Sequence, residues 1–407
     1  MTEILLPRSV AILFFRRIGA RFFKVRFSKF FGTRFYTTGI TNDINTANQL
    51  VPSENDQQLS LLFNQFPVND IRYAFGYGSG VFQQAGYDKL RPQIDMIHIV
   101  DDPLRFHILN TERNRSHYSG LLCLGINAVL AVQNYGAGVY FNPYVALKDQ
   151  EGNENMVKYG VVSTETALKD IQEWSTLYIA GRLQKPVKYL HGDETLRRAN
   201  DHNLRSAFNL SLLLLSRGKE SELLTHTRIY EKVALLSYMG DPRMVVGGEN
   251  PNKVRNIVSK QKEKFDFLYH PYLEESMQKG YLVRLGDKYE VRLNKDSVSQ
   301  ILATLPFQFR KKLLNSYRNK YKLQLLQDDS AEQVLLGNNK EMAVGPYLRE
   351  ILMDRGLKRA LMASLLATIA YPALIQSLKG IFSAGIVKST KYALEKKRKS
   401  WEKAARE

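Results

Sequence analysis

Cysteine is almost absent from this 407-residue chain, which contains Cys123 alone. A single cysteine excludes a disulfide framework and a zinc site built from cysteines. Acidic residues are also in short supply, because 40 Asp and Glu stand against 58 Lys and Arg and leave a formal net charge of +18. An excess of this size favours anionic partners, namely nucleic acid, phosphates or an acidic membrane surface.

The shortage of acidic residues is most pronounced in residues 1–40. Eight Lys or Arg and eight Phe occur there, and Glu3 is the one acid. An arginine-rich, acid-poor, amphipathic start is typical of a mitochondrial presequence, and the interspersed arginines exclude a spanning helix. We predict a presequence over residues 1–36 and a polar linker over 37–58. A basic arm that binds membrane or nucleic acid is the alternative.

Residues 59–220 alternate between strand and helix patterns, which predicts an α+β domain with a largely antiparallel or mixed sheet. Residues 221–330 read as helices followed by a hairpin around Gly286-Asp287, an order that resembles a winged helix. A generic α+β subdomain is the alternative for this second block. We expect strands over 71–76, 93–100, 138–147 and 156–162, helices over 164–176, 203–216, 222–238, 252–269 and 271–279, and the hairpin over 281–293.

Residues 340–407 form a third, helical block. Leu361–Leu378 is mostly apolar, and Lys388–Glu407 is strongly basic and carries Trp401. A basic, Trp-bearing end after an apolar stretch is typical of an amphipathic helix that lies in the plane of an anionic membrane. We therefore predict a membrane-associating segment. A spanning helix and ordinary packing against the protein body are the alternatives.

Two common glycine motifs are missing from the glycine-rich stretch YAFGYGSGVF, residues 73–82. A Walker A loop needs a lysine directly after its last glycine, and the first lysine that follows this stretch is Lys89. The dinucleotide fingerprint fails because the third glycine comes one residue early. A tight structural turn is one interpretation of these glycines. The other is a loop whose backbone closely approaches a ligand.

A carboxylate follows this loop in an otherwise apolar predicted strand, QIDMIHIV. Burying the charged side chain of Asp95 in such a strand costs free energy unless the carboxylate is paired or binds a cation. A Gly-Ser loop followed by a strand-borne aspartate is typical of nucleotidyltransferases of the polymerase-beta type. We expect Gly78, Ser79 and Gly80 to hold the triphosphate and Asp95 to hold Mg²⁺. Asp95 and Ser79 are therefore the candidate catalytic residues.

The second carboxylate that such sites place two residues further on is missing, because Ile97 occupies that position. Asp101 and Asp102 end the same predicted strand and are the candidate substitutes as metal ligands. Asp102 is also a suitable N-cap for a helix that begins at Pro103.

Four polar residues recur along that helix at helical spacing: His107, Asn110, Asn114 and His117. Intervals of three, four and three residues place them on one face. We predict that this stripe faces the substrate. Ordinary exposed surface is the alternative, and a zinc site is disfavoured because asparagine is a poor zinc ligand.

Several of these motifs together resemble one family. GYGSGVF, IDMIHIVDDP and FHILNTERNRSHYS are similar to segments of the mitochondrial translocator assembly and maintenance proteins, which are the peripheral phosphatidate cytidylyltransferases, or CDP-diacylglycerol synthases, of mitochondria. The resemblance extends from about residue 66 to residue 269. Phe106 departs from the family pattern, which usually has Trp at this position. The further matching segments are YGVVS, GRLQKPV, LSYMGDPRM and NKVRNIV.

The resemblance implies an enzyme that joins CTP to phosphatidic acid with Mg²⁺, giving CDP-diacylglycerol and diphosphate for phosphatidylglycerol and cardiolipin synthesis. It also implies a peripheral protein on the matrix side of the mitochondrial inner membrane, with no nucleic-acid partner. Lys185, Lys253 and Arg255 lie in matching motifs and are candidate contacts for the substrate anions. A nucleotidyltransferase that acts on RNA and a non-enzymatic assembly factor of the inner membrane are the alternatives.

Overall fold

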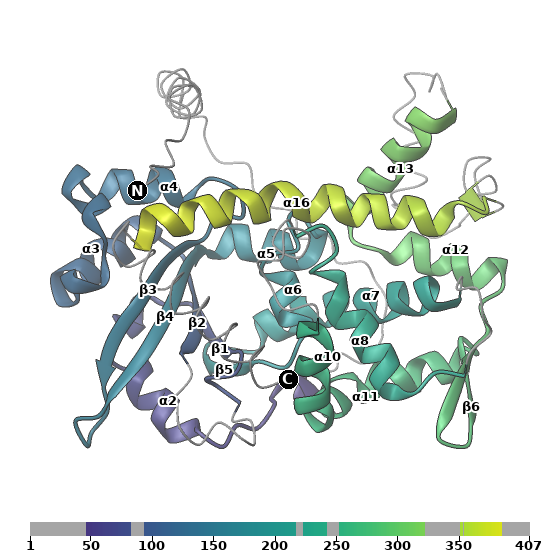
Figure 1. The fold of residues 1–407 in the computed structure, drawn as a ribbon, viewed down its shortest axis with the longest axis horizontal. Coiled ribbons are helices and arrows are strands. Elements are labelled where there is room, and N and C mark those ends of the chain that lie inside the picture. Colours follow the sequence, from purple (N-terminus) through teal and green to yellow (C-terminus); the bar gives the residue numbers. More distant parts are fainter. Residues whose placement is uncertain are drawn as a thin grey trace, which may run out of the picture. The chain divides into compact units, whose positions relative to one another are not determined.

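The fold is described from a computed structural model of the chain (Figure 1). The structure describes residues 46–82, 93–216, 223–241, 252–321, 351–352 and 354–384. Three predicted segments lie outside these residues, namely the presequence, residues 37–45 of the linker and the basic C-terminal stretch, and for them the predictions stay predictions. The remainder of the predicted linker is described and contains a short turn at Ala47–Gln49 and the start of a helix at Asp56.

Five strands form one mixed sheet in the order β3-β4-β2-β1-β5. Strands β2 and β4 are parallel, and the other neighbouring pairs are antiparallel. This confirms the predicted α+β class with a mixed sheet. The short strand β5 was not predicted, because its four residues show no alternation of apolar and polar side chains. The strands are β1 (Tyr73–Tyr77), β2 (Ile94–Val100), β3 (Tyr140–Lys148), β4 (Glu154–Ser163) and β5 (Lys188–His191).

Helices cover both faces of this sheet. On one face, Met96 and Tyr159 pack with apolar residues of α2 and with Phe106 of α3. On the other, Ile97 and Ile99 pack with residues of α5, α6 and the start of α7. The helices and turns of this part are η1 (Ala47–Gln49), α2 (Asp56–Phe63), η2 (Val68–Asp70), α3 (Pro103–Arg113), η3 (Arg115–His117), η4 (Gly120–Leu124), α4 (Ile126–Gln133), α5 (Thr164–Glu173), α6 (Ala180–Leu183) and α7 (Thr195–Ser216).

A second core is built from helices and a two-stranded hairpin. Its apolar cluster contains residues of α7 and of the helices that follow, so the long helix α7 contributes to both parts of the protein. The predicted hairpin is present as β6 and β7. The elements are α8 (His226–Leu236), α10 (Lys253–Lys260), α11 (Lys262–Gln278), β6 (Leu282–Leu285), β7 (Lys288–Val291), α12 (Lys295–Thr304) and α13 (Phe307–Tyr321).

The predicted break before Pro271 is wrong. Helix α11 runs through this proline, and the chain instead breaks at Gln261, between α10 and α11. The buried residues on either side of the proline, Tyr269 and Tyr272 among them, belong to one apolar cluster. Burial of this continuous face outweighs the loss of one backbone hydrogen bond at the proline.

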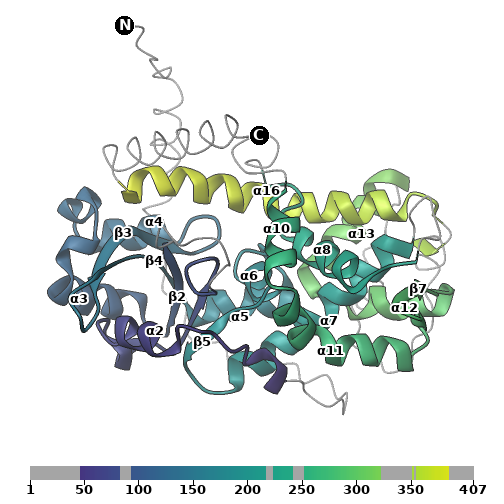
Figure 2. The same cartoon turned by 60° about the horizontal axis from the view of Figure 1, so that its bottom comes forward.

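Helix α16 (Leu357–Ala384) passes along both the sheet and the helical part (Figure 2). Its segment Leu357–Gly380 contains an 18-residue window with a mean hydropathy of 1.6 and is long and apolar enough to cross a membrane, by length and composition alone. In the structure, however, one side of the helix is buried. Leu357, Leu361 and Leu365 belong to the helical core. Packing against the body therefore accounts for part of the apolar pattern.

Candidate functional site

The glycine-rich stretch forms a turn directly beside Asp95. Strand β1 ends at Tyr77, whose Cα pairs with that of Asp95 on β2. Gly78 follows with φ +82°, a conformation that favours glycine, and the amides of Val81 and Phe82 both donate to its carbonyl oxygen. A Cβ atom on Gly78 would lie 3.5 Å from Asp95 Oδ2. The turn thus brings the backbone of the loop against the predicted metal ligand.

Gly80 is required for a different reason. A Cβ atom at this position would lie 2.3 Å from the carbonyl oxygen of Gln93 and 2.8 Å from the Cα of Ile94. These are backbone atoms at the start of β2, which cannot move without displacing Asp95. The glycine therefore allows the loop and the strand to touch.

Gly80→Ala is expected to lower the free energy of unfolding by about 1–3 kcal/mol, because the added methyl group overpacks a backbone contact. Denaturant unfolding of the purified protein measures this. Gly120→Ala is the matched control, since a Cβ atom there meets nothing within 4 Å. Equal stability of the two variants would contradict the close approach.

Asp95 faces the side of the sheet on which Ile97 and Ile99 pack, and Lys158 is its register partner on β4. The Lys158 Nζ lies 3.7 Å from Asp95 Oδ1, and the side chain of Asp95 is 26% exposed. Burial raises the pKa of the Asp95 carboxyl, and the charge of Lys158 offsets part of this. Burial acts to lower the pKa of Lys158, but Asp95 together with Tyr77 and Tyr178 outweighs burial, so the pKa is raised.

Three aromatic rings surround a second cation of the site, Arg182. Its guanidinium carbon lies 3.9 Å from the ring centre of Tyr178, 5.3 Å from that of Tyr77 and 6.0 Å from that of Phe141. Lys158 also lies over the Phe141 ring, at 4.7 Å. Contacts of this kind stabilise a desolvated cation.

Asp170 fixes the start of α6 and therefore the position of Arg182. Its carboxylate is buried and accepts hydrogen bonds from backbone amides of the preceding turn and of α6, including those of Leu177 (2.8 Å), Ile179 (2.8 Å) and Ala180 (3.1 Å). A carboxylate at a helix N-terminus satisfies amides that lack a partner within the helix. The acid thus has a structural role at a distance from the cations.

Two lysines lie close to the ring of one tyrosine beside this group. Lys185 and Lys253 lie 5.1 Å and 5.2 Å from the ring centre of Tyr238. Lys185 donates to the carbonyl oxygen of Gly181 and to Ser237 Oγ. Burial, together with the charges of Arg182 and Lys253, lowers the pKa of Lys185 to about 7. Lys253 is close enough to Asp95 to lower the pKa of that carboxyl slightly.

This cluster, which we call the cation site, consists of Lys158, Arg182, Lys185 and Lys253 around Asp95. Four basic groups near one carboxylate leave an excess of positive charge that suits a polyphosphate. Within the described ranges, no group of three or more His, Cys, Asp or Glu side chains could hold a metal ion. One carboxylate nevertheless fits Mg²⁺, which usually takes one or two protein carboxylates together with substrate phosphates.

The structure does not bring Asp101 and Asp102 to Asp95. Asp95 is near the start of β2 and Asp101 follows its end, six residues or about 20 Å away at the rise of an extended strand. Thr164 Oγ1 donates to Asp101 Oδ1, and Asp102 caps α3 by accepting from the Arg105 amide. The prediction that either completes the Asp95 metal shell is wrong. The predicted N-cap is confirmed.

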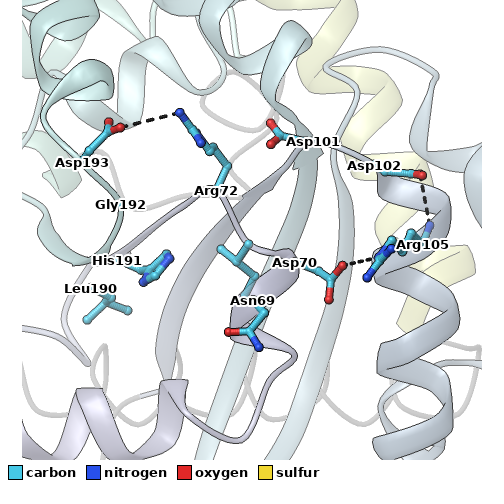
Figure 3. A pocket seen from close by; sticks show the side chains of 11 residues that line it. Asn69, Asp70, Arg72, Asp101, Asp102, Arg105, Leu190, His191, Gly192 and Asp193 are labelled. Atoms are coloured by element: carbon cyan, nitrogen blue, oxygen red, sulfur yellow. Dashed lines mark hydrogen bonds and ion pairs between the residues drawn. The ribbon is translucent and has the colours of Figure 1, made fainter.

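Asp101 and Asp102 instead line a cavity of about 820 Å³ at that opposite end of the strands (Figure 3). Its charged groups are largely paired with one another. Arg105 contacts Asp70 at 2.6 Å, and Arg72 lies 3.6 Å from Asp193. The cavity is therefore separate from the cation site.

The polar stripe does not face Asp95 either. His107 and Asn110 are fully buried, and both contact the hydroxyl of Tyr118, at 2.7 Å and 3.0 Å. Asn110 also donates to the hydroxyl of Tyr159 at 2.7 Å, and Tyr159 packs on the face of the sheet opposite to Asp95. Burial lowers the pKa of His107 to about 4, so its ring is neutral.

The helix that was to carry all four residues of the stripe is also shorter than predicted. It ends at Arg113, Asn114 is its C-cap, and His117 lies in the separate turn η3. Asn114 donates to Asn110 Oδ1 at 3.0 Å, and His117 Nδ1 lies 3.2 Å from the Tyr159 hydroxyl. The four residues do meet, but in a network closed by protein partners, so the prediction that they face the substrate is wrong.

Of the three predicted anion contacts, Lys185 and Lys253 belong to the cation site and Arg255 does not. Arg255 is exposed, and residues two apart on a helix project about 200° apart, so it points away from Lys253. Sequence reasoning missed Lys158 and Arg182. Register with Asp95 singles out Lys158, so it has no local signal. Of the three rings around Arg182, Tyr178 is four residues away, but Tyr77 and Phe141 come from distant strands.

The comparisons with known proteins all point to one family. A family model described as mitochondrial phosphatidate cytidylyltransferase matches residues 59–399. A relative of that name from Xenopus laevis is 38% identical over 345 residues, covering 83% of this chain and 93% of the relative. Another from Schizosaccharomyces pombe is 34% identical over 374 residues and covers 86% of both chains. A third, from Saccharomyces cerevisiae, is 36% identical over 358 residues, covering 87% of this chain and 74% of the relative.

Proposed function

Because this chain belongs to the mitochondrial phosphatidate cytidylyltransferase family, we propose that it transfers the cytidylyl group of CTP to phosphatidate at the cation site, giving CDP-diacylglycerol and diphosphate. The observation that supports this placement is the contact of the Gly78–Gly80 turn with Asp95 in the midst of four cations. The relatives' names favour this reaction over transfer to RNA and over a non-enzymatic role.

In this proposal the backbone of Gly78, Ser79 and Gly80 holds the CTP phosphates, and the cation site neutralises the charge that builds up on the departing diphosphate. The phosphate of phosphatidate is already ionised at neutral pH, so it attacks the α-phosphorus without a strong general base. The chain accelerates the reaction by positioning the two anions in line and by offsetting their mutual repulsion. We propose a polymerase-beta type arrangement for this domain on the same grounds.

Asp95 is the residue that would hold Mg²⁺ here. A bound Mg²⁺ would neutralise charge on the phosphates of CTP. The position two residues after Asp95 cannot supply a second carboxylate, because it is occupied by Ile97, which is fully buried in the apolar cluster on the same face. Lys158 supplies positive charge at this edge of the sheet. The test is conversion of labelled CTP and dispersed phosphatidate to CDP-diacylglycerol, with Mg²⁺ or with EDTA. Absence of product from folded protein would overturn the proposal.

CTP binding is expected to weaken as the pH rises above 7, by up to roughly tenfold per pH unit. The pKa of Lys185 is about 7 without ligand, and a bound phosphate favours its charged form and raises that pKa. Binding above pH 7 therefore takes up a proton. Calorimetry in two buffers of different ionisation enthalpy measures the uptake. The matched control is Lys185→Arg, which stays charged and should remove the pH dependence. The same slope in both proteins would exclude Lys185 from the phosphate contacts.

We further propose that the protein is peripheral on the matrix side of the mitochondrial inner membrane, with α16 as its membrane-facing element. The outward side of α16 exposes Met362, Leu366, Tyr371, Leu374 and Leu378 by 38–62%, which is unusual for adjacent apolar residues on one helix. Helix α16 also passes close to the cation site. Leu366 contacts Gly240, which lies two residues after Tyr238. A lipid held at this helix could therefore present its phosphate to the site.

A further inference from the structure

One exposed apolar segment outside α16 is not explained by the reaction. Residues 120–126, GLLCLGI, comprise the turn η4 and two residues that follow; we call this segment the leucine loop. Leu124 at its tip is 77% exposed, the highest value among the exposed large apolar residues of the described chain. Cys123 beside it is also exposed. Single exposed leucines are common on protein surfaces, so only the surroundings of Leu124 can indicate whether it belongs to a binding surface.

The leucine loop is firmly attached to the body of the protein. Leu121, Leu122 and Ile126 pack against a small buried cluster that contains Tyr118 and Tyr140. Gly125 has φ +87° and ends the turn, which leaves Leu124 directed outwards. The apolar tip is therefore presented by anchored neighbours, and its exposure is a property of the fold.

The leucine loop also adjoins α16. Turn η4 packs against α16, and α16 is clamped close by, where the Lys379 Nζ donates to the carbonyl oxygens of Gln133 (3.0 Å) and Tyr135 (2.8 Å) at the end of α4. The exposed Leu374 and Leu378 lie on this end of α16. Two exposed apolar surfaces from distant parts of the sequence are thus held next to each other.

The charge around the leucine loop is positive. Arg113 and Arg115, just before it, are exposed beside one exposed acid, Glu112, and the chain as a whole carries a formal net charge of +18. Exposed apolar residues with flanking arginines suit an anionic bilayer, because the side chain enters the apolar region while the cations stay at the phosphates. A protein partner would not explain this combination as directly.

We propose that the leucine loop is a second membrane contact, which inserts Leu124 into an anionic phospholipid bilayer beside α16. Two separate contacts fix the orientation of the protein on the membrane, whereas one helix leaves it free to rotate about the helix axis. This inference rests on the proposed lipid substrate and membrane-facing role of α16, and it adds a site to them.

The chain offers a direct probe, because Cys123 is its only cysteine and lies next to Leu124. The full chain, labelled at Cys123 with a fluorophore that reports polarity, is mixed with vesicles of phosphatidylcholine, with or without phosphatidic acid. The emission is expected to rise and shift to the blue on vesicles with phosphatidic acid only. An unchanged emission while the protein floats with these vesicles would overturn the proposal. An equal shift at high protein concentration without vesicles would also overturn it, in favour of self-association.

The matched variants are Leu124→Asp and Leu285→Asp, the latter at an exposed position on the distant hairpin (44% exposed). We expect Leu124→Asp to weaken vesicle binding about tenfold and Leu285→Asp to leave it unchanged. Equal binding of the two variants would contradict the inserted loop. Activity on phosphatidate in detergent micelles distinguishes failure of the membrane contact from failure of the proposed function. Leu124→Asp should retain this activity, because no bilayer is needed. An inactive unmodified protein in micelles would count against the proposed function itself.

Discussion

Asp95→Asn is expected to lower the rate of CDP-diacylglycerol formation by about 10³-fold or more. The amide keeps the shape of the side chain but loses the charge that would hold Mg²⁺ at the phosphates. Binding of CTP in EDTA should be at least as tight as in the unmodified protein, because a negative charge has been removed beside the Gly78–Gly80 turn. Added Mg²⁺ should no longer improve it. Rate assays and calorimetry together measure these effects.

Asp101→Asn is the matched control for this experiment. Asp101 was also a candidate metal ligand, but it lies beyond the far end of β2 and accepts a hydrogen bond from Thr164. We expect its loss to leave the rate within about threefold, as for a surface substitution away from the site. Comparable losses of activity in the two variants would mean that the cation site is not where the chemistry occurs.

The double substitution Tyr371→Glu with Leu374→Glu is expected to reduce binding to vesicles that contain phosphatidic acid by about 10²-fold. Both side chains are largely exposed, at 62% and 48%, so the fold should tolerate the change. Each loses the free energy of entering the bilayer and gains repulsion from anionic lipids. Flotation with vesicles measures the effect. Phe267→Glu, at a comparably exposed position of α11, is the control.

Substitution is a sharper test of α16 than deletion. Removing residues 356–407 would also remove Leu357, Leu361 and Leu365, which are fully buried in the helical core. Loss of membrane binding in such a protein would follow from unfolding. Removing residues 385–407 leaves α16 intact and tests the basic stretch alone. Retained vesicle binding by the double substitution, with a melting temperature close to that of the unmodified protein, would show that α16 does not face the membrane.

The local order of elements could be predicted from the sequence because it depends on neighbouring residues. Alternation of apolar and polar residues, and the turn residues between them, predicted strands β1 to β4 and the hairpin. The capping pair Asp102-Pro103 predicted the start of α3, and the glycine pattern with Asp95 indicated the loop that the structure places against that carboxylate. The family resemblance also came from short continuous motifs.

The composition of the cation site, in contrast, depends on the tertiary structure. Lys158 reaches Asp95 through the parallel pairing of β4 with β2, and Arg182 lies between rings from β1, β3 and the segment before α6. Spacing along one chain cannot reveal such contacts. The same limit explains the wrong assignment of the polar stripe. Helical spacing grouped His107 with Asn110, but the hydroxyl of Tyr118 contacts both, and Asn110 also donates to Tyr159 on the face of the sheet opposite to Asp95.

For this protein, the sequence by itself determined the family, the strands β1 to β4, the hairpin, and the turn that meets Asp95. Those features follow from propensities and motifs within about ten residues of one another. Only the tertiary structure decided which charges surround that carboxylate, because strand register and helix packing join residues far apart in the chain. It also decided that α16 is buried on one side and exposed on the other, since a run of apolar residues is compatible with both core and membrane.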